Sequence, residues 1–437
     1  MAALTQDLEG PILQIGTDLA TKMPRPRAVS TARVERRMQE LLMSDPALRA
    51  ALFRFVDVRP ACATPQDVTR HLHELLAEAE EESKLANRAT GITAKKFATR
   101  PVAAIAATGV KQMAQRFIVG ADAKDSLPTI TGLWKNGVDA TVDLLGEATV
   151  TETEADAYMR RCEETLRALA AAAKKYPNRD VNLSVKVSAL TPLLRNPMAP
   201  ERGIEGARPR LRHLMQVARD VNAHLHVDME SFDTREAITR LTLDLLSEPE
   251  FANGPSAGIV LQAYLVDSPD YLDELLTWAR NTPRKHPFTI RLVKGAYWDH
   301  EVVQAAQNGW TPPVFTDRRE CDRNFEKLTK VLIDNAGPVK VAIASHNLRS
   351  IAAAAAYADS RNVGNDLLEF QILRGLGDDT QAAIAATGRR VRCYCPVGDL
   401  VAGMAYLVRR LLENTANDSF LAAHASGITT AELLEAP

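Results

Sequence analysis

The chain has 437 residues, of which 46 % are hydrophobic, and its 53 Lys and Arg nearly balance its 55 Asp and Glu, giving a formal net charge of −2. This near-neutrality argues against a nucleic-acid-binding protein, whose binding domain is normally clearly basic. No stretch approaches the roughly 18 consecutive apolar residues of a membrane-spanning helix. The first twenty residues carry acids and lack the basic start of a secretory signal. The sequence therefore favours a soluble, cytoplasmic globular protein, and its length favours an enzyme.

The cysteines do not form the pattern of a disulfide framework, because they are odd in number and scattered: Cys62, Cys162, Cys321, Cys393 and Cys395. Only Cys393 and Cys395 lie close together, and neither a second pair nor a neighbouring His completes a tetrahedral zinc site. We therefore expect no metal and interpret Cys393 and Cys395 as alternating residues of an extended segment.

The first 115 residues predict a helical region. Apolar spacing indicates helices over 31–43, 47–55 and 65–85, the second of them preceded by a capping residue and a proline in 44–46. A group of basic residues here is compatible with contact to an anionic membrane surface, and the alternative is a solvated arm. These residues are Lys22, Arg25, Arg27, Arg33, Arg36 and Arg37.

From residue 116 onward, short β-rich runs alternate with helical stretches such as 154–175 and 348–358. Eight repeated β-α units predict a parallel sheet, and they fit a (β/α)8 barrel better than an open doubly wound sheet. A Rossmann dinucleotide site is not expected, because no Gly-x-Gly-x-x-Gly loop follows an early strand. The candidate strands are 116–120, 140–145, 181–188, 224–228, 258–264, 288–294, 340–346 and 367–372.

Charged and amide residues collect at the carboxyl ends of these candidate strands, where active sites of such barrels lie. Burying so many polar groups at one rim would be costly without a function. Their positive members suit a pyrophosphate, a carboxylate or an electron-rich ring that gains charge, and Asp228 supplies the opposing carboxylate. The set comprises Asp143, Glu147, Lys186, Asp228, Gln262, Tyr264, Arg291, Lys294, His346, Asn347 and Gln371.

A final predicted helix over 406–414 carries Arg409, Arg410 and Glu413 at spacings of three and four, so they lie on adjoining faces. Two interpretations stay open. The residues form a surface ion pair on an ordinary helix, or the paired arginines clamp a small carboxylate while Glu413 orients one of them.

Two long motifs resemble the proline dehydrogenase domain of proline utilization A (PutA) proteins. They are the segment RLVKGAYW at 291–298 and YCPVG at 394–398 followed by YLVRRLLEN at 406–414. Shorter matches follow in the same order along most of the chain, over 53–58, 146–148, 186–190, 262–264, 345–347 and 369–371.

The resemblance implies a (β/α)8 flavoenzyme that binds FAD noncovalently. Such an enzyme oxidises L-proline to Δ1-pyrroline-5-carboxylate by hydride transfer to the flavin N5 and passes the electrons to a quinone. Peripheral membrane contact is implied by that acceptor. We accordingly divide the chain into an N-terminal helical region over 1–115 and a barrel with its active-site helix over 116–437.

The resemblance also implies roles for single residues. Arg291 lies beside the flavin N5, and Asp228 organises Lys186. The implied cofactor-binding residues are Gln262, Arg291, Val293, Lys294, Gly295, Ala296, Trp298, Thr316, Arg318, His346, Asn347 and Gln371. The implied substrate-binding residues are Lys186, Arg409, Arg410, Tyr394, Leu373, Tyr264 and Ala296, with Glu413 holding an arginine and with Asp143 and Glu147 as supporting acids.

The sequence departs from the family at two places. Many relatives have Thr-Arg-Lys where this chain has Thr316-Asp317-Arg318, which puts the usual arginine contact to FAD in doubt unless Arg319 compensates. Arg374 stands where relatives often have His, beside the pocket residue Leu373.

Bifunctional relatives continue into an NAD-dependent half, the Δ1-pyrroline-5-carboxylate dehydrogenase, near the point where this sequence ends at 432–437. Either the chain is a monofunctional enzyme or the sequence is one part of a longer protein. Nothing in it resembles the ribbon-helix-helix domain of some relatives, so no nucleic-acid partner is expected.

Two other functions are weighed against this one. A barrel aldolase or lyase would use Lys186 as a Schiff-base nucleophile. A catalytically weak regulatory remnant would explain Asp317 and the missing second half.

Overall fold

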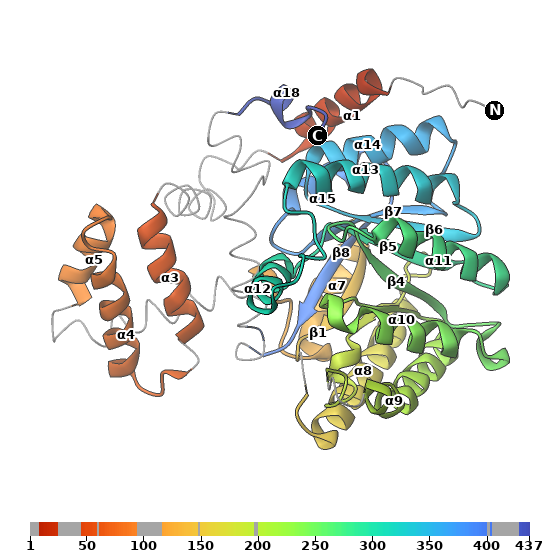
Figure 1. Ribbon diagram of the computed structural model, residues 1–437, viewed down its shortest axis with the longest axis horizontal. Coiled ribbons are helices and arrows are strands. Elements are labelled where there is room, and N and C mark those ends of the chain that lie inside the picture. The colour runs from red at the N-terminus through yellow and green to blue at the C-terminus, as the bar shows by residue number, and fades with distance from the viewer. Residues whose placement is uncertain are drawn as a thin grey trace.

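The computed structural model describes residues 8–24, 45–58, 61–93, 116–146, 149–195, 200–399, 403 and 428–437. Its centre is a closed barrel of eight parallel strands in sequence order, with β8 hydrogen-bonded to β1 (Figure 1). The strands are β1 (Asp139–Leu144), β2 (Asn182–Val185), β3 (His224–Val227), β4 (Ser256–Gln262), β5 (Phe288–Val293), β6 (Val339–Ala344), β7 (Leu368–Leu373) and β8 (Val391–Val397). The predicted (β/α)8 barrel is confirmed.

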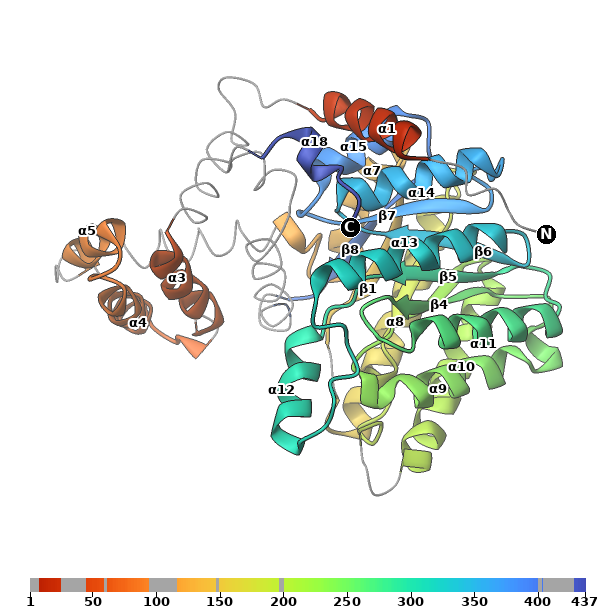
Figure 2. The ribbon, with the colours of Figure 1, turned by 45° about the horizontal axis from the view of Figure 1, so that its top comes forward.

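Helices surround the barrel (Figure 2) and bury the apolar outer faces of the strands in one continuous core. Local signals fix where several of them begin. Thr151 and Glu154 form a capping box at one helix, and Asn347 caps another by accepting a hydrogen bond from Ser350 N. The helices are α7 (Ala123–Lys135), α8 (Glu152–Ala173), α9 (Pro200–Asp220), α10 (Phe232–Leu246), α11 (Ser268–Asn281), α12 (Trp298–Asn308), α13 (Arg318–Asp334), α14 (Leu348–Ser360) and α15 (Asp378–Ala386).

The interior of the barrel is unusually polar. Barrels of this class are normally filled by branched apolar side chains. Here, alternate residues of the first three strands are buried polar groups: Asp139, Thr141, Asp143, Asn182, Ser184, His224 and His226. The barrel is therefore polar in its core as well as at its rim.

One predicted strand is wrong and one strand was missed. Residues 118–120 are not a strand, although Val119 N donates to Pro396 O and Gly398 N donates to Gly120 O, both at 2.9 Å. The reason is that β1 and β8 already pair with each other, which leaves no free edge for a further ladder. The missed strand is β8, whose alternating Cys393 and Cys395 confirm the extended segment expected there.

The N-terminal region is helical, as predicted. The helix expected over 47–55 is α3 (Pro46–Val58). The helix expected over 65–85 is α4 (Pro65–Glu78), which ends earlier than predicted, and a separate helix, α5 (Lys84–Thr93), follows it. The predicted helices over 31–43 and 406–414 lie outside the described residues, as do Arg25, Arg27, Arg33, Arg36 and Arg37.

A helix that the sequence did not predict, α1 (Glu9–Lys22), packs on α14 and α15 and on α18 (Thr430–Leu433). Buried Arg349 joins both ends of the chain to the barrel, because it donates to the Glu9 carboxylate at 2.5 and 2.7 Å and to Leu434 O at 3.0 Å.

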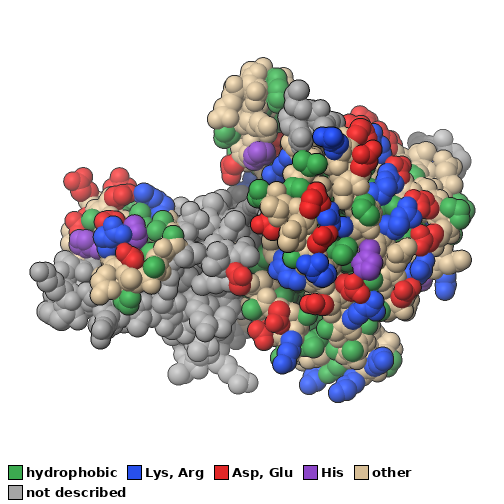
Figure 3. Space-filling view, turned by 90° about the horizontal axis from the view of Figure 1, so that it is seen from below, with side chains coloured by type: hydrophobic (Ala, Val, Ile, Leu, Met, Phe, Trp, Pro, Cys, Tyr) green, Lys and Arg blue, Asp and Glu red, His purple; other side chains and the backbone are tan. Residues whose placement is uncertain are grey.

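The surface mixes both signs of charge, as Figure 3 shows for one face, in keeping with the near-zero net charge. Within the part of the chain that the structure describes, no helix is both long and apolar enough to cross a membrane.

Candidate active site

A cluster of buried charged side chains lies at the carboxyl ends of the strands, with Asp228 at its centre. Lys186 Nζ lies 2.5 Å from Asp143 Oδ1 and 3.3 Å from Asp228 Oδ2. Arg291 Nη1 donates to Asp228 Oδ1 at 2.9 Å, and the Tyr394 hydroxyl donates to Asp228 Oδ2 at 2.7 Å. The structure thus brings five of the predicted site residues, from β1, β5, β8 and the ends of β2 and β3, into one hydrogen-bonded group.

The cluster shifts the pKa values of its two carboxyl groups in opposite directions. Burial raises the pKa of Asp143 more than the charge of Lys186 lowers it. Burial also acts to raise the pKa of Asp228, but the charges of Lys186 and Arg291 outweigh it and hold that pKa below its usual value. Two neighbouring carboxyl groups with separated pKa values are typical of functional sites.

Lys186 stays protonated in this environment. Burial disfavours its charge, but the negative charge of Asp143 outweighs that penalty with the help of the other acidic groups around it, so the pKa of Lys186 is well above its usual value. A Schiff-base lysine needs the opposite, a lowered pKa that frees the amine. The cluster therefore suits Lys186 to the binding of an anion rather than to nucleophilic attack.

Several buried polar atoms in and around the cluster have no hydrogen-bond partner among the described residues. Among them are Asp143 Oδ2, Gln262 Oε1 and Arg291 Nε, on side chains that are 1 %, 2 % and 3 % exposed. Leaving such an atom unsatisfied costs about 1–3 kcal/mol. Polar atoms of this kind at the carboxyl end of a barrel indicate a place where a bound molecule completes the hydrogen bonding.

The turn after β5 is built around Gly295. Its φ of +137° is a conformation that disfavours other residues, and a Cβ there would lie 2.5 Å from the Tyr264 ring. Tyr264 N in turn donates to Lys294 O at 2.7 Å. Of the predicted cofactor residues in this turn, Lys294 and Gly295 are therefore held against Tyr264 by close packing.

Other predicted cofactor residues make structural contacts away from Asp228. Lys294 pairs with Asp322 of α13, and Trp298 Nε1 donates to Phe315 O at 2.9 Å. His346 Nε2 accepts a hydrogen bond from Leu373 N at 3.0 Å. Gln371 Nε2 donates to Glu369 Oε1 at 2.6 Å, which turns it toward the amino end of the barrel.

The departure at 316–318 has a local structural explanation. Asp317 is the N-cap of α13, where its carboxylate accepts a hydrogen bond from Arg319 N at 2.8 Å, and Arg318 is the first residue of that helix. Thr316 directly precedes the cap. Asp317 therefore serves helix α13, and Arg319 also takes part in this turn.

Four predicted site residues, Glu147, Arg409, Arg410 and Glu413, lie outside the described residues. The structure adds three residues that sequence reasoning missed. Ser184 Oγ accepts from both Arg291 Nη atoms at 3.3 Å, and the Tyr158 hydroxyl accepts from Lys186 N at 3.2 Å. The third is Glu230, whose carboxylate accepts two hydrogen bonds from Ser188. Ser184 and Glu230 alternate with predicted residues two positions away, a signal that could have found them, whereas Tyr158 lies on a helix without such a signal.

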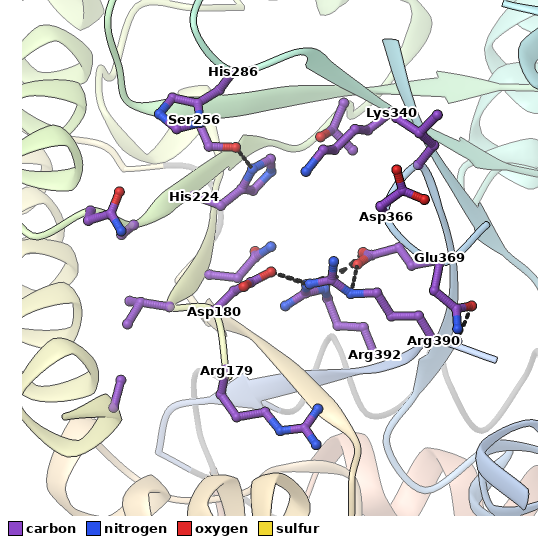
Figure 4. A pocket seen from close by; sticks show the side chains of 18 of the residues that line it. Arg179, Asp180, His224, Ser256, His286, Lys340, Asp366, Glu369, Arg390 and Arg392 are labelled. Atoms are coloured by element: carbon purple, nitrogen blue, oxygen red, sulfur yellow. Dashed lines mark hydrogen bonds and ion pairs between the residues drawn. The ribbon is translucent and has the colours of Figure 1, made fainter. Parts of the chain in front are cut away.

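A second charged region lies at the opposite, amino end of the barrel, around a cavity of about 350 Å³ (Figure 4). Arg392 donates to the Glu369 carboxylate at 2.8 and 2.9 Å and to Asp180 at 3.1 Å, and Arg390 pairs with Asp139 at 2.9 Å. In barrels of this class the active site lies at the carboxyl end of the strands, whereas the amino end contributes to stability. Throughout the described ranges, no group of three or more His, Cys, Asp or Glu is arranged to hold a metal ion.

Comparison with known proteins gives matches over both parts of the chain. The family described as proline dehydrogenase matches residues 126–423, and the proline utilization A N-terminal domain matches residues 9–117. The bifunctional protein PutA of Klebsiella aerogenes is 33 % identical over 320 residues, which cover 71 % of this chain and 24 % of that protein. Proline dehydrogenase 1 of Bacillus subtilis (strain 168) is 26 % identical over 315 residues, covering 72 % of this chain and 91 % of that protein.

A solved structure extends the likeness to the fold of nearly the whole chain. The crystal structure of PutA from Bdellovibrio bacteriovorus inactivated by N-propargylglycine superposes with a TM-score of 0.87 at 34 % identity. It covers 99 % of this chain and 44 % of that one. The chain therefore spans about a quarter of the bifunctional relative and less than half of the PutA chain of known structure.

Proposed function

This chain belongs to the proline dehydrogenase family, and on that premise we propose that it oxidises L-proline to Δ1-pyrroline-5-carboxylate with noncovalent FAD. The resemblance to the proline dehydrogenase domain of PutA proteins is confirmed by the matches over both regions. The single observation that carries the proposal is the Asp228-centred cluster, with the two basic side chains of Lys186 and Arg291 and with unsatisfied polar atoms at the carboxyl end of the barrel.

The residues present fit a flavin. Arg291 Nε is a buried donor and Gln262 Oε1 a buried acceptor, and a flavin ring offers both acceptors and an N–H donor along its polar edge. When bound, FAD supplies the acceptor for the hydride that leaves proline C5. We propose that the residues which hold it are Gln262, Arg291, Val293, Lys294, Gly295, Ala296, Trp298, Thr316, Arg318, His346, Asn347 and Gln371.

Each residue of the cluster has a separate task in this proposal. The Arg291 guanidinium is a preorganised positive charge that stabilises the negative charge developing on a reduced ring. The Lys186 ammonium binds the proline carboxylate, and Asp143 and Asp228 keep it charged and fixed in place. This positioning of the substrate lowers the entropic cost of reaching the transition state.

Tyr394 forms one wall of the proposed pocket. Its hydroxyl is anchored on Asp228, and the Arg291 guanidinium lies 5.3 Å from its ring centroid. Burial raises the pKa of Tyr394 well above its ordinary value, so the hydroxyl remains a donor. We propose that Leu373, Tyr264 and Ala296 complete the pocket and that Arg409 and Arg410, with Glu413, add a second hold on the carboxylate.

The wider setting is also proposed from the family. A quinone takes the electrons, and a Δ1-pyrroline-5-carboxylate dehydrogenase, on this chain's protein or a separate one, takes the product. The enzyme works in the cytoplasm and meets the membrane peripherally through the basic residues near the N-terminus. The division into 1–115 and 116–437 stays part of this proposal.

An absorption spectrum of the purified chain tests the function. Loading with FAD should give the two visible flavin bands, which L-proline should bleach under anaerobic conditions and a soluble quinone should restore. A protein that stays colourless with added FAD, or a bound flavin that proline does not bleach, would overturn the proposal. Trapping of Lys186 by borohydride with a carbonyl substrate would favour the aldolase alternative instead, and proline turnover at ordinary rates would exclude an inactive remnant.

A further inference from the structure

Glu230 is a buried acid near the proposed active site that has no part in the Asp228 cluster. It lies two residues after Asp228 in the loop that follows β3, and it is 1 % exposed. Its carboxylate accepts two hydrogen bonds from Ser188, from Oγ at 2.6 Å and from the backbone N at 3.3 Å. Arg195 Nη2 approaches the same carboxylate at 3.5 Å. A buried carboxyl group with this many donors is held in one geometry.

Through Ser188, Glu230 acts on Lys186. Ser188 lies in the short 3-10 turn Val187–Ala189, which starts immediately after Lys186. The Ser188 carbonyl in turn accepts from Thr149 N and Oγ1, each at 3.4 Å, which ties the loop after β1 to the same point. The carboxylate of Glu230 therefore fixes the turn from which the Lys186 side chain projects.

Through its backbone carbonyl, Glu230 acts on Gln262. Gln262 Nε2 donates to Glu230 O at 2.9 Å, so the amide nitrogen is occupied and Oε1 is the atom left without a partner among the described residues. Fixing the amide in this way decides that Gln262 presents an acceptor rather than a donor. One residue thus connects the loops after β1, β2 and β3 with the end of β4.

We propose that Glu230 is a positioning residue. It orients the Lys186 ammonium toward bound proline and the Gln262 acceptor toward bound FAD. The inference rests on the proposed function. It assigns Glu230 an effect on flavin affinity as well as on proline turnover, because Gln262 and Lys186 face different molecules.

The variant E230Q keeps the size of the side chain but replaces an acceptor by an amide that cannot accept both Ser188 bonds. We expect kcat/KM for proline to fall about 10- to 100-fold, the loss typical of a misplacement of about 1 Å. Because the carboxylate also anchors the loop that carries Glu230 O, the acceptor of the Gln262 amide, we expect the dissociation constant for FAD, measured by titration of the full-length apoprotein, to rise severalfold. E248Q is the matched control, since Glu248 pairs with Arg212 beyond the far end of α10, and it should leave both quantities within twofold.

A double-mutant cycle with S188A separates positioning from general destabilisation. If Glu230 acts through Ser188, E230Q should cost clearly less in kcat/KM in the S188A background than in the wild type. Should E230Q fail to fold, S188A alone must still raise the FAD dissociation constant and lower kcat/KM, and wild-type values there would overturn the proposal.

E230Q with wild-type FAD affinity and kcat/KM, and only a lower thermal midpoint, would also overturn it by showing a purely structural role. A wild-type protein that binds no FAD would instead defeat the proposed function itself, so the two failures are distinguishable.

Discussion

The two ends of this barrel both bury ionic clusters, yet they differ in how completely the charges are satisfied. At the amino end, Arg392 places its guanidinium on Glu369, Asp180 and Ala140 O, so its donors are used within the protein. At the carboxyl end, Arg291 and Gln262 each keep a buried atom without a partner among the residues described. Arg392, whose donors are all used by the protein, therefore serves the fold, whereas the remaining Arg291 donor suits the molecule that we propose binds there. The amino end is not fully satisfied either, because Asn182 Oδ1 beside its cavity also lacks a partner among the described residues.

The pKa directions repeat this contrast. Burial alone would raise the pKa of Glu369, but the charge of Arg392 outweighs it and lowers that pKa to about 2, as expected of a carboxylate kept permanently ionised. In the Asp228 cluster, one carboxyl pKa is raised and the other lowered. The amino-end cluster thus stabilises the charge of its carboxylate, whereas the Asp228 cluster shifts its two carboxyl groups in opposite directions.

The largest expected effect comes from breaking the amino-end cluster. R392M leaves the largely buried Glu369 carboxylate with fewer partners, and breaking a buried pair in this way costs about 3–5 kcal/mol of unfolding free energy. Urea unfolding of the wild-type and R392M apoproteins measures this loss of unfolding free energy. Activity per folded molecule should stay within about threefold, and a loss of activity without a loss of stability would contradict the separation of the two ends.

Replacing Arg291 at the carboxyl end of the barrel should lower the reaction rate more than it lowers stability. We expect R291M to reduce the rate of anaerobic flavin reduction by proline about 100- to 1000-fold, the range for one preorganised electrostatic donor. Stopped-flow absorbance at saturating FAD and proline measures this rate. A reduction rate close to that of the wild type would exclude Arg291 from the role proposed here.

The amino-end cluster also predicts an acid limit to stability. Because the pKa of Glu369 is lowered from 4.5 to about 2, its contribution is present above pH 4.5 and is lost as the pH falls toward 2. That loss amounts to about 3 kcal/mol by linkage. Unfolding free energies measured across this range should fall more steeply for the wild type than for E369Q, and parallel curves would contradict the assignment.

The smallest expected effect concerns the turn beside the proposed flavin site. G295A combines a positive φ with a Cβ contact of 2.5 Å to Tyr264 and should cost about 1–3 kcal/mol. G309A is the matched control, because Gly309 also has a positive φ, +69°, but no atom within 4 Å of an added Cβ. Equal losses of unfolding free energy in the two variants would mean that the Tyr264 contact contributes nothing.

Much of this architecture follows from sequence alone. Alternation of β-rich and helical segments predicted the barrel, because parallel strands buried on both faces need helices between them. The same alternation put Lys186, Asp228 and Arg291 at strand ends, and parallel strands bring such ends to one rim. The paired arginines of 406–414 lie outside the described residues, and their role in binding the carboxylate stays a prediction.

Other features depend on contacts between residues far apart in the chain, so only the tertiary structure decided them. The segment 116–120 has the composition of a strand. Because β1 pairs with β8 and closes the barrel, no strand edge is left with which this segment could form a ladder. Whether a buried charge is satisfied depends on partners such as Arg392 and Asp180, 212 positions apart. The sequence determined which side chains reach the inside of the barrel, and folding decided which of them are saturated and which still lack a partner, because hydrogen bonds form between atoms that only folding brings together.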